Sequence, residues 1–191
     1  MRTPLRVMVL AVAATLSAAA APPALDAQNW TRLMVGLAPS FPVGDLATDH
    51  GAGGGLQLGV VLGSQRGRSG LRLDLASAIM PGQSGRVFGT DLEAGYLGLA
   101  FQQWFARSGA PVRPNLLVGG GVSGARYTGD ARPGVSLQRD YDFRYQPRLS
   151  AGADLTLGKV VLFVEVGPSR VAIDDRSRYF VAPVLGGRIR L

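Results

Sequence analysis

The chain has 191 residues, a formal net charge of +7 and 47% hydrophobic residues, with 27 glycines, 12 prolines and no cysteine. The length fits one domain, and the absence of cysteine excludes a disulfide framework and a thiolate metal site, so burial and hydrogen bonding must hold the fold. Lys159 is the only lysine, so nearly all of the positive charge comes from arginine.

Residues 1–27 predict a secretory signal peptide. Arg2 and Arg6 precede a run of small and apolar residues, and the small residues up to Ala27 offer a cleavage site. The apolar run is shorter than the ~20 residues that a membrane-spanning helix needs, which disfavours an uncleaved anchor. We therefore expect an exported chain whose folded domain comprises residues 28–191.

The rest of the chain predicts an all-β fold. Apolar and polar residues alternate in stretches of about ten residues, the pattern of strands that have one apolar face. In one such stretch, Leu71, Leu73 and Leu75 share one face, and Arg72 and Asp74 share the other. Eight stretches alternate in this way, in chain order at about 31–39, 53–63, 69–80, 91–104, 113–127, 146–157, 160–170 and 179–191.

The connections between these stretches alternate along the chain between longer and shorter ones. The longer connections are expected at about 40–52, 81–89, 128–145 and 171–178. If the exported N-terminus starts on the periplasmic side, all of these face outward. Bacterial transmembrane barrels share this pattern of short periplasmic turns and long external loops, with an even number of antiparallel strands. The sequence therefore predicts an eight-stranded antiparallel up-and-down transmembrane β-barrel.

Charged side chains on the polar faces of these strands are expected to point into the barrel lumen. Acids and arginines gathered there can neutralise one another, which matters because an unpaired buried charge is costly. The predicted lumen network consists of Arg72, Asp74, Arg148, Asp154, Glu165, Arg188 and Arg190. Because an eight-stranded barrel leaves an interior that side chains just fill, we expect a filled interior and no wide pore.

Aromatic residues fall near the ends of the predicted strands. Amphipathic rings prefer the two interfaces between membrane and water, so these residues predict two girdles. The girdle on the periplasmic side is expected to consist of Trp30, Trp104 and Phe105. The girdle on the external side is expected to consist of Tyr127, Tyr145, Tyr179 and Phe180.

The first predicted hairpin carries a family resemblance. It reads Leu37-Ala-Pro-Ser-Phe-Pro-Val-Gly-Asp-Leu-Ala, followed by His50-Gly-Ala-Gly-Gly-Gly-Leu-Gln-Leu-Gly-Val, and resembles that of small bacterial outer-membrane β-barrel domain proteins of the OmpA/OmpX type. The resemblance covers essentially the whole mature chain. It implies a location in the cell outer membrane, contact with outer-membrane lipid, and assembly by the barrel insertion machinery through the C-terminal strand. Such chains commonly end on an aromatic residue, whereas this one ends on Leu191.

Motif searches predict no catalytic residue, cofactor or metal site. The stretch 119–124 matches GxGxxG, but strand and turn residues follow it, whereas a dinucleotide site needs a helix there. His50 is the only histidine, and we expect it in a solvated loop. A histidine metal cluster is excluded, and a Ser/His pair would need that loop to fold onto a barrel serine. Nucleic acid is disfavoured as a partner because export removes it.

Three functions remain open at this point. The first is a non-enzymatic outer-membrane barrel that contributes to envelope structure or surface interaction through its long loops. The second is a soluble periplasmic barrel that carries an apolar ligand and has its apolar faces turned inward. The third is a lipid-modifying outer-membrane enzyme that uses His50. For the first, the longest loop offers charged and aromatic residues suited to surface recognition, namely Arg132, Arg139, Tyr141, Phe143 and Arg144.

Overall fold

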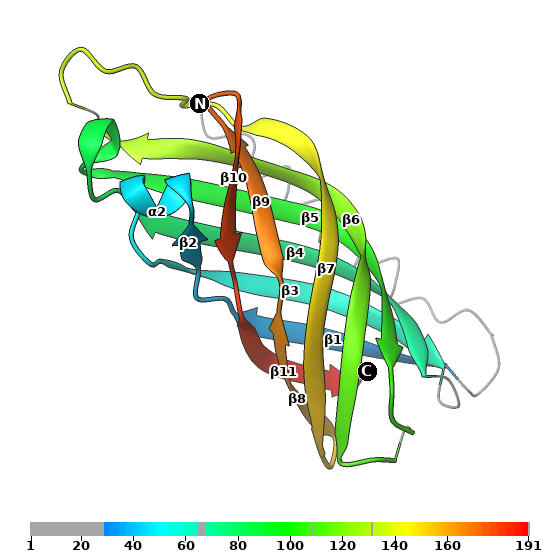
Figure 1. Cartoon of the computed structure of the whole chain (residues 1–191). Helices are drawn as coiled ribbons and strands as arrows, with labels where there is room; N and C mark the ends of the chain where they lie inside the picture. The colour runs from blue at the N-terminus through cyan, green and yellow to red at the C-terminus, as the bar shows by residue number, and fades with distance from the viewer. Residues whose placement is uncertain (1–28, 65–67, 108, 131, 191) are drawn as a thin grey trace.

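Eight antiparallel strands close into a barrel in the computed structural model, which describes residues 29–64, 68–107, 109–130 and 132–190 (Figure 1). The predicted signal peptide and Leu191 lie outside these residues. The barrel order is β1-β11-β8-β7-β6-β5-β4-β3, and β3 pairs back onto β1. The barrel strands are β1 (Asn29–Leu37), β3 (Gly54–Ser64), β4 (Ser69–Pro81), β5 (Thr90–Trp104), β6 (Val112–Gly129), β7 (Asp142–Leu157), β8 (Val160–Val166) and β11 (Val184–Arg190). The structure confirms the predicted fold class.

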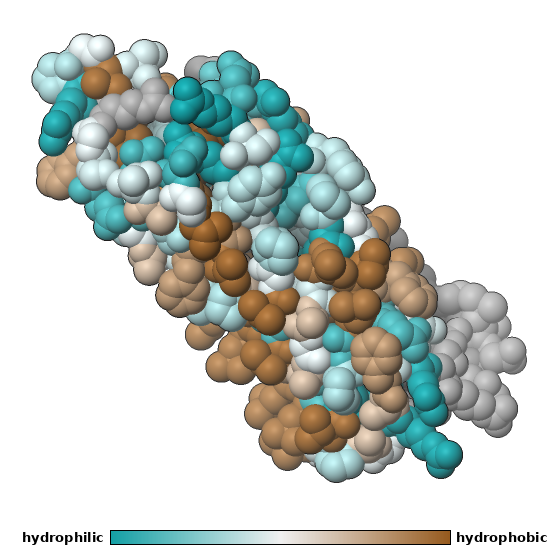
Figure 2. Space-filling view, viewed as in Figure 1, coloured by the Kyte–Doolittle hydropathy of each residue, from teal (hydrophilic) through white to brown (hydrophobic). Residues whose placement is uncertain are grey.

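Apolar side chains of the barrel strands point outward. Leu71 is 50% exposed and Leu185 is 63% exposed. Arg72, which follows Leu71 in the same strand, points inward and is fully buried. Figure 2 shows the result, with hydrophobic residues gathered over the part of the barrel nearer β8 and β11 and hydrophilic residues over the opposite end. An apolar-ligand carrier in water would need the reverse arrangement, so the second function is overturned. No helix among the described residues is long and apolar enough to cross a membrane.

The two ends of the barrel differ in structure. At one end, here called the turn end, β1 begins, β11 ends, and short connections join β3 to β4, β5 to β6 and β7 to β8. The opposite end, the loop end, carries a second sheet with the order β2-β10-β9. Its elements, with the short helices beside it, are β2 (Phe41–Val43), α2 (Asp45–Asp49), η1 (Gly85–Val87), β9 (Pro168–Ile173) and β10 (Arg176–Val181).

The predicted connection 171–178 is therefore mostly strand. Val171 to Ile173 belong to β9, and Arg176 to Arg178 to β10, and a two-residue turn joins them. Both turn residues, Asp174 and Asp175, have positive φ, at 50° and 59°. That is the geometry of a tight hairpin turn that follows the twist of its strands, and Asp tolerates it better than most residues.

Beyond Val166 the barrel wall loses its ladder. β7 and β8 pair from Leu157↔Val160 to Ala151↔Val166. Continuing this register would place Pro168 opposite Leu149 and Pro147 opposite Arg170, and proline has no N–H to donate. The side-chain amide of Gln146 bridges the two strands instead, because it donates to the Arg170 carbonyl at 3.0 Å and accepts from its N–H at 3.2 Å. We call this boundary between β7 and β9 the seam.

The second sheet covers the inner faces of β4, β5 and β6 at the loop end, as β9 and β10 do in Figure 1. An apolar cluster fills the space between them, here called the loop-end cluster. Its buried members include Leu46, Met80, Leu92, Tyr127, Leu137, Val171, Ile173 and Phe180. The barrel interior is thus apolar at the loop end and charged in its middle.

The girdle prediction is wrong for three aromatic residues. Trp104 is fully buried inside the barrel, and Tyr127 and Phe180 lie in the loop-end cluster. Each sits near a strand end but at a position whose side chain points inward, and alternation decides the face. The side chains of Phe105, Tyr145 and Tyr179 are exposed. That of Trp30 lies outside the described side chains.

Candidate functional site

Six charged residues inside the barrel form one connected network. Arg72 Nε donates to Asp74 Oδ1 at 2.7 Å, and Arg72 Nη1 donates to Glu165. Arg148 Nη1 donates to the second oxygen of Asp74 at 2.8 Å. Arg188 completes the network, because Nη1 lies 2.5 Å from Asp154 Oδ2 and Nη2 lies 2.6 Å from Glu165 Oε1. The side chain of Arg190, also predicted here, lies outside the described ones.

This network joins four different strands, β4, β7, β8 and β11. Its three arginines balance its three carboxylates, so the pairs offset the cost of removing these charges from water. The carboxylates are occupied by arginines, which favours a structural role over acid–base chemistry. In the region that the structure describes, His, Asp and Glu side chains form no group of three that could hold a metal ion.

Three neutral side chains attached to the network did not stand out in the sequence. Gln57 donates to Asp74 at 2.8 Å, Asn115 donates to Asp154 at 3.1 Å, and Trp104 Nε1 donates to Asp154 at 2.9 Å. All three lie at inward positions of their strands. The alternation of inward and outward residues along each strand was the signal that could have found them. For Trp104, this alternation places the side chain inside the barrel and not in a girdle.

His50 is buried at the loop end, which corrects its predicted place in a solvated loop. Its ring is 1% exposed and stacks on Tyr127 at a centroid distance of 5.7 Å. Neither ring nitrogen has a hydrogen-bond partner in the structure. Burial lowers the pKa of His50 below its ordinary value, and the carboxylate of Asp49 opposes this only in part. No serine therefore contacts this imidazole, so the geometry gives no support to the third function.

An exposed group of aromatic and arginine side chains lies at the loop end. Tyr141 and Phe143 stack with a centroid distance of 5.5 Å, and the Arg126 guanidinium lies 4.8 Å from the Tyr141 ring centroid. Arg144 pairs with Asp142 at 2.6 Å. We call Arg126, Tyr141 and Phe143 the aromatic–arginine patch; Arg144 lies on the opposite face of β7, with Asp142 and Asp175. Burial and nearby Glu93 raise the pKa of Tyr141, so its hydroxyl stays neutral.

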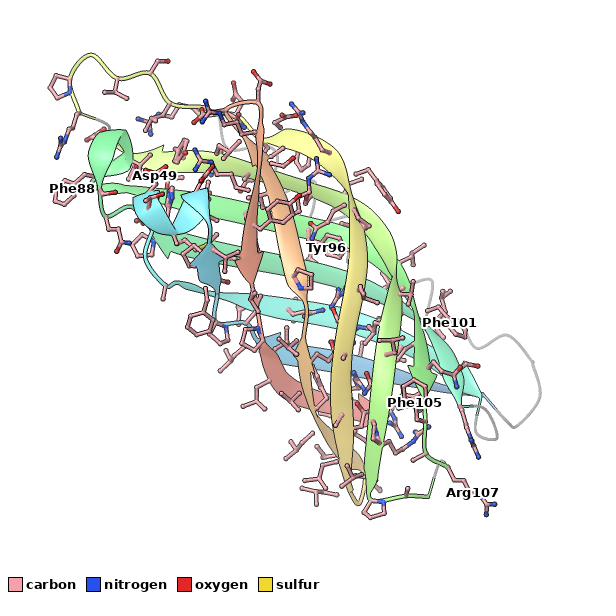
Figure 3. All side chains as sticks on the ribbon, in the orientation of Figure 1. Asp49, Phe88, Tyr96, Phe101, Phe105 and Arg107 are labelled. Carbon is pink, nitrogen blue, oxygen red and sulfur yellow. The ribbon has the colours of Figure 1, made fainter. Side chains whose placement is uncertain are left out.

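The predicted recognition residues do not all meet in this patch. Arg132 lies over the Phe88 ring, 5.6 Å from its centroid, and Arg139 donates to the carbonyl of Gly129. Figure 3 shows Phe88 at the tip of the loop end. The connection 130–141 thus contributes to two places on this end of the molecule. Arg132, Arg139 and Tyr141 are close in the sequence, so the sequence alone could not show that they lie at two different places.

Charge is distributed unevenly along the barrel axis. Arg68, Arg107 and Lys159 are exposed in the three connections at the turn end, and those connections contain no Asp or Glu. Figure 3 shows Arg107 projecting from this end. At the loop end three arginines have acidic partners among the described contacts, in Arg126–Glu93 at 2.8 Å, Arg144–Asp142 at 2.6 Å and Arg178–Asp49 at 3.3 Å. The turn end is therefore the purely basic one.

Comparisons with known proteins show the fold. No family model and no curated protein matches the chain. The structure of Ail, the attachment invasion locus protein of Yersinia pestis, in complex with the heparin analogue sucrose octasulfate is similar, with a TM-score of 0.58 and 15% identity over 86% of this chain and 99% of Ail. Neisserial surface protein A (NspA) has a TM-score of 0.53 and 14% identity over 84% of this chain and 96% of its own. In its fold the chain thus resembles these small eight-stranded barrels, as the sequence predicted.

Proposed function

We propose that the protein is a non-enzymatic integral protein of the bacterial outer membrane that interacts with partners through its loop end. The outward apolar face of a closed barrel carries this proposal. Exposed Leu71, Leu185 and Ile189 would be unfavourable in water, whereas lipid accepts them. The closed ladder leaves few unpaired backbone groups, as a span through lipid requires.

The charge distribution supports the same location. Lys159 lies in a two-residue turn between Leu157 and Val160, both exposed and apolar. A cation so close to the apolar band would sit at the level of lipid headgroups, where it can pair with phosphate. The turn end would face the periplasm, and the C-terminal strand β11 would be the part that the insertion machinery recognises.

The aromatic–arginine patch is the proposed interaction surface. Exposed aromatic rings and arginines are enriched among residues that dominate binding energies. Phe143 is 56% exposed, and Tyr141 and Arg126 stack beside it. Flat rings with nearby guanidinium groups fit a ligand that has both sugar rings and anionic groups. Ail was crystallised with sucrose octasulfate, which makes that compound the natural first probe.

Two experiments test the proposal. For location, outer membranes are isolated and the mature chain is run on a gel with and without boiling. A band in this fraction that shifts on heating is expected, and recovery in the soluble periplasm without a shift would overturn the membrane assignment.

For the surface, binding of sucrose octasulfate is measured for the refolded protein and for Phe143→Ala. A loss of roughly tenfold is expected for removal of one stacking ring. Leu149→Ala, on the lipid face, is the matched control.

A further inference from the structure

Arg113 is a buried arginine that the charged network does not use. It is the first inward residue of β6 at the turn end, and its side chain is 3% exposed. Asp154 on β7 lies directly opposite it in the ladder. A cross-strand pair of opposite charge would be the simplest arrangement at this place. The contacts of Asp154 show that its carboxylate is committed elsewhere.

Other donors occupy both oxygens of Asp154. Arg188 Nη1 donates to Oδ1 at 2.6 Å and to Oδ2 at 2.5 Å. Asn115 donates to Oδ1 at 3.1 Å, and Trp104 donates to Oδ2 at 2.9 Å. These contacts use the roughly four lone-pair sites of one carboxylate. Arg113 therefore does not obtain its counter-charge from the residue opposite.

The positive charge of Arg113 adds to a network that is already balanced. The three arginines of that network match its three carboxylates. Among the described side chains of the turn-end half, no further carboxylate points into the lumen. The adjoining connections carry Arg107 and Lys159, and Figure 3 shows Arg107 at this end. Because an enclosed charge without a counter-charge is costly, this end of the lumen favours an anion.

The unpaired atoms of Arg113 define the shape of that anion. The guanidinium lies over the Trp104 ring, with Cζ 4.8 Å from the ring centroid. Nε and Nη2 have no hydrogen-bond partner among the described residues. These two nitrogens form one edge of the planar guanidinium, and their parallel N–H groups match two oxygens of a carboxylate or a phosphate. Stacking on Trp104 fixes the plane of the guanidinium and leaves this edge unpaired.

The mouth of the lumen at the turn end lies beside this edge. Thr156 is the next inward residue after Asp154 on β7, diagonal to Arg113 in the ladder, and it is partly exposed. Diagonal neighbours of a ladder lie about 7–8 Å apart, which is within reach of a long side chain. An anion that enters the lumen at Thr156 can therefore meet the Arg113 guanidinium.

We propose that Arg113 binds an oxyanion, a carboxylate or a phosphate, that enters the lumen from the turn end. Nε–H and Nη2–H donate to two of its oxygens, and the Thr156 hydroxyl supplies a further donor. The anion neutralises the charge that the network leaves uncompensated. Under the proposed function this end faces the periplasm, but the site itself needs only the folded barrel.

The test uses the mature chain, labelled with ¹⁵N-arginine and refolded in micelles of an uncharged detergent. Phosphate or acetate replaces chloride at constant ionic strength, and the Arg113 Nε–H resonance is followed by NMR. A saturable shift is expected with both oxyanions, because chloride has no pair of oxygens to match the guanidinium edge. A resonance that stays in place in both titrations would overturn the proposal.

A charge-preserving variant separates the paired edge from general attraction. Arg113→Lys keeps the positive charge but lacks the two parallel N–H groups, so phosphate should bind at least about tenfold more weakly. The Trp104 Nε1–H resonance reports binding in this variant. Arg68→Gln removes an exposed charge at the same end and should change the affinity by no more than about twofold. Weakened binding in Arg68→Gln with normal binding in Arg113→Lys would overturn the proposal.

A last comparison identifies the source of the anion. Micelles that contain phosphatidylglycerol, without free phosphate, are compared with the phosphate titration. A shift of the Arg113 resonance with phosphatidylglycerol assigns a lipid headgroup as ligand, and a shift with free phosphate or acetate alone assigns a soluble one. The titrations of the unaltered chain need no variant, so a poorly folding variant leaves them intact. Heat-shifted migration reports the barrel separately, so failure of the proposed function is distinguishable from failure of this site.

Discussion

Arg188 on β11 holds Asp154 on β7 in a two-point ion pair, with Nη1 at 2.6 Å from Oδ1 and 2.5 Å from Oδ2. Both side chains are fully enclosed. β7 and β11 are not neighbours in the barrel, because β8 lies between them. The pair thus spans β8 on the inner face of the barrel and ties its two neighbouring strands together.

Removing one partner of this pair should strongly destabilise the barrel. Asp154→Asn leaves the Arg188 guanidinium buried without its main counter-charge, and we expect a loss of about 3–5 kcal/mol in the free energy of unfolding. Urea titration of the refolded protein, followed by the heat-shifted gel band, measures it. Asp142→Asn breaks the exposed pair with Arg144 and should cost under about 1 kcal/mol. Similar losses in both variants would refute a special role for the lumen network.

A charged side chain placed on the outer face of the barrel should destabilise the protein. Val164 lies in the middle of β8 and is 47% exposed. In a bilayer, Val164→Arg should cost about 2–4 kcal/mol near the midplane. Unfolding by urea in lipid vesicles measures the change. Ser136→Arg, in the exposed connection between β6 and β7, is the control and should stay within about 0.5 kcal/mol. A neutral result for Val164→Arg would mean that this face does not contact lipid.

The loop end should loosen at mildly acidic pH. Burial lowers the pKa of His50 below its ordinary 6.5, so the closed form keeps the ring neutral while an opened form binds a proton at higher pH. The opened form then carries more protons, so stability is full above pH 6.5 and decreases as pH falls below it. Hydrogen exchange of the α2 amides, corrected for intrinsic rates, should show faster opening at acidic pH. His50 is the only histidine, so His50→Phe should remove this dependence.

Anionic lipid should stabilise the inserted protein through the turn end. Arg68, Arg107 and Lys159 are exposed there, and each should contribute about 1 kcal/mol near a negatively charged membrane surface. The measurement compares urea unfolding in neutral vesicles and in vesicles containing phosphatidylglycerol. The triple change Arg68→Gln, Arg107→Gln, Lys159→Gln should remove the difference. Arg132→Gln with Arg139→Gln, at the loop end, serves as control, and an equal effect there would argue against phosphate contact at the turn end.

Alternation along the chain was sufficient for the barrel. Leu71, Arg72 and Leu73 show why, because a strand with one apolar face and one charged face has a single favourable orientation in lipid. Eight such stretches with alternating connection lengths then specify the strand number and the order of neighbours. The inward placement of Arg188 follows from the same parity, with no knowledge of its partner.

Only the tertiary structure decided which inward side chains form ion pairs and how the loop end is built. Nothing local in the chain joins Arg188 to Asp154 and Glu165, since strand stagger and tilt decide which inward side chains meet. The burial of His50 and Phe180 depends on the β9–β10 hairpin, which continues from β8 and β11 and packs opposite β4, β5 and β6 at the loop end. The seam likewise depends on the register between the two strands, which places Pro168 opposite Leu149 and Pro147 opposite Arg170.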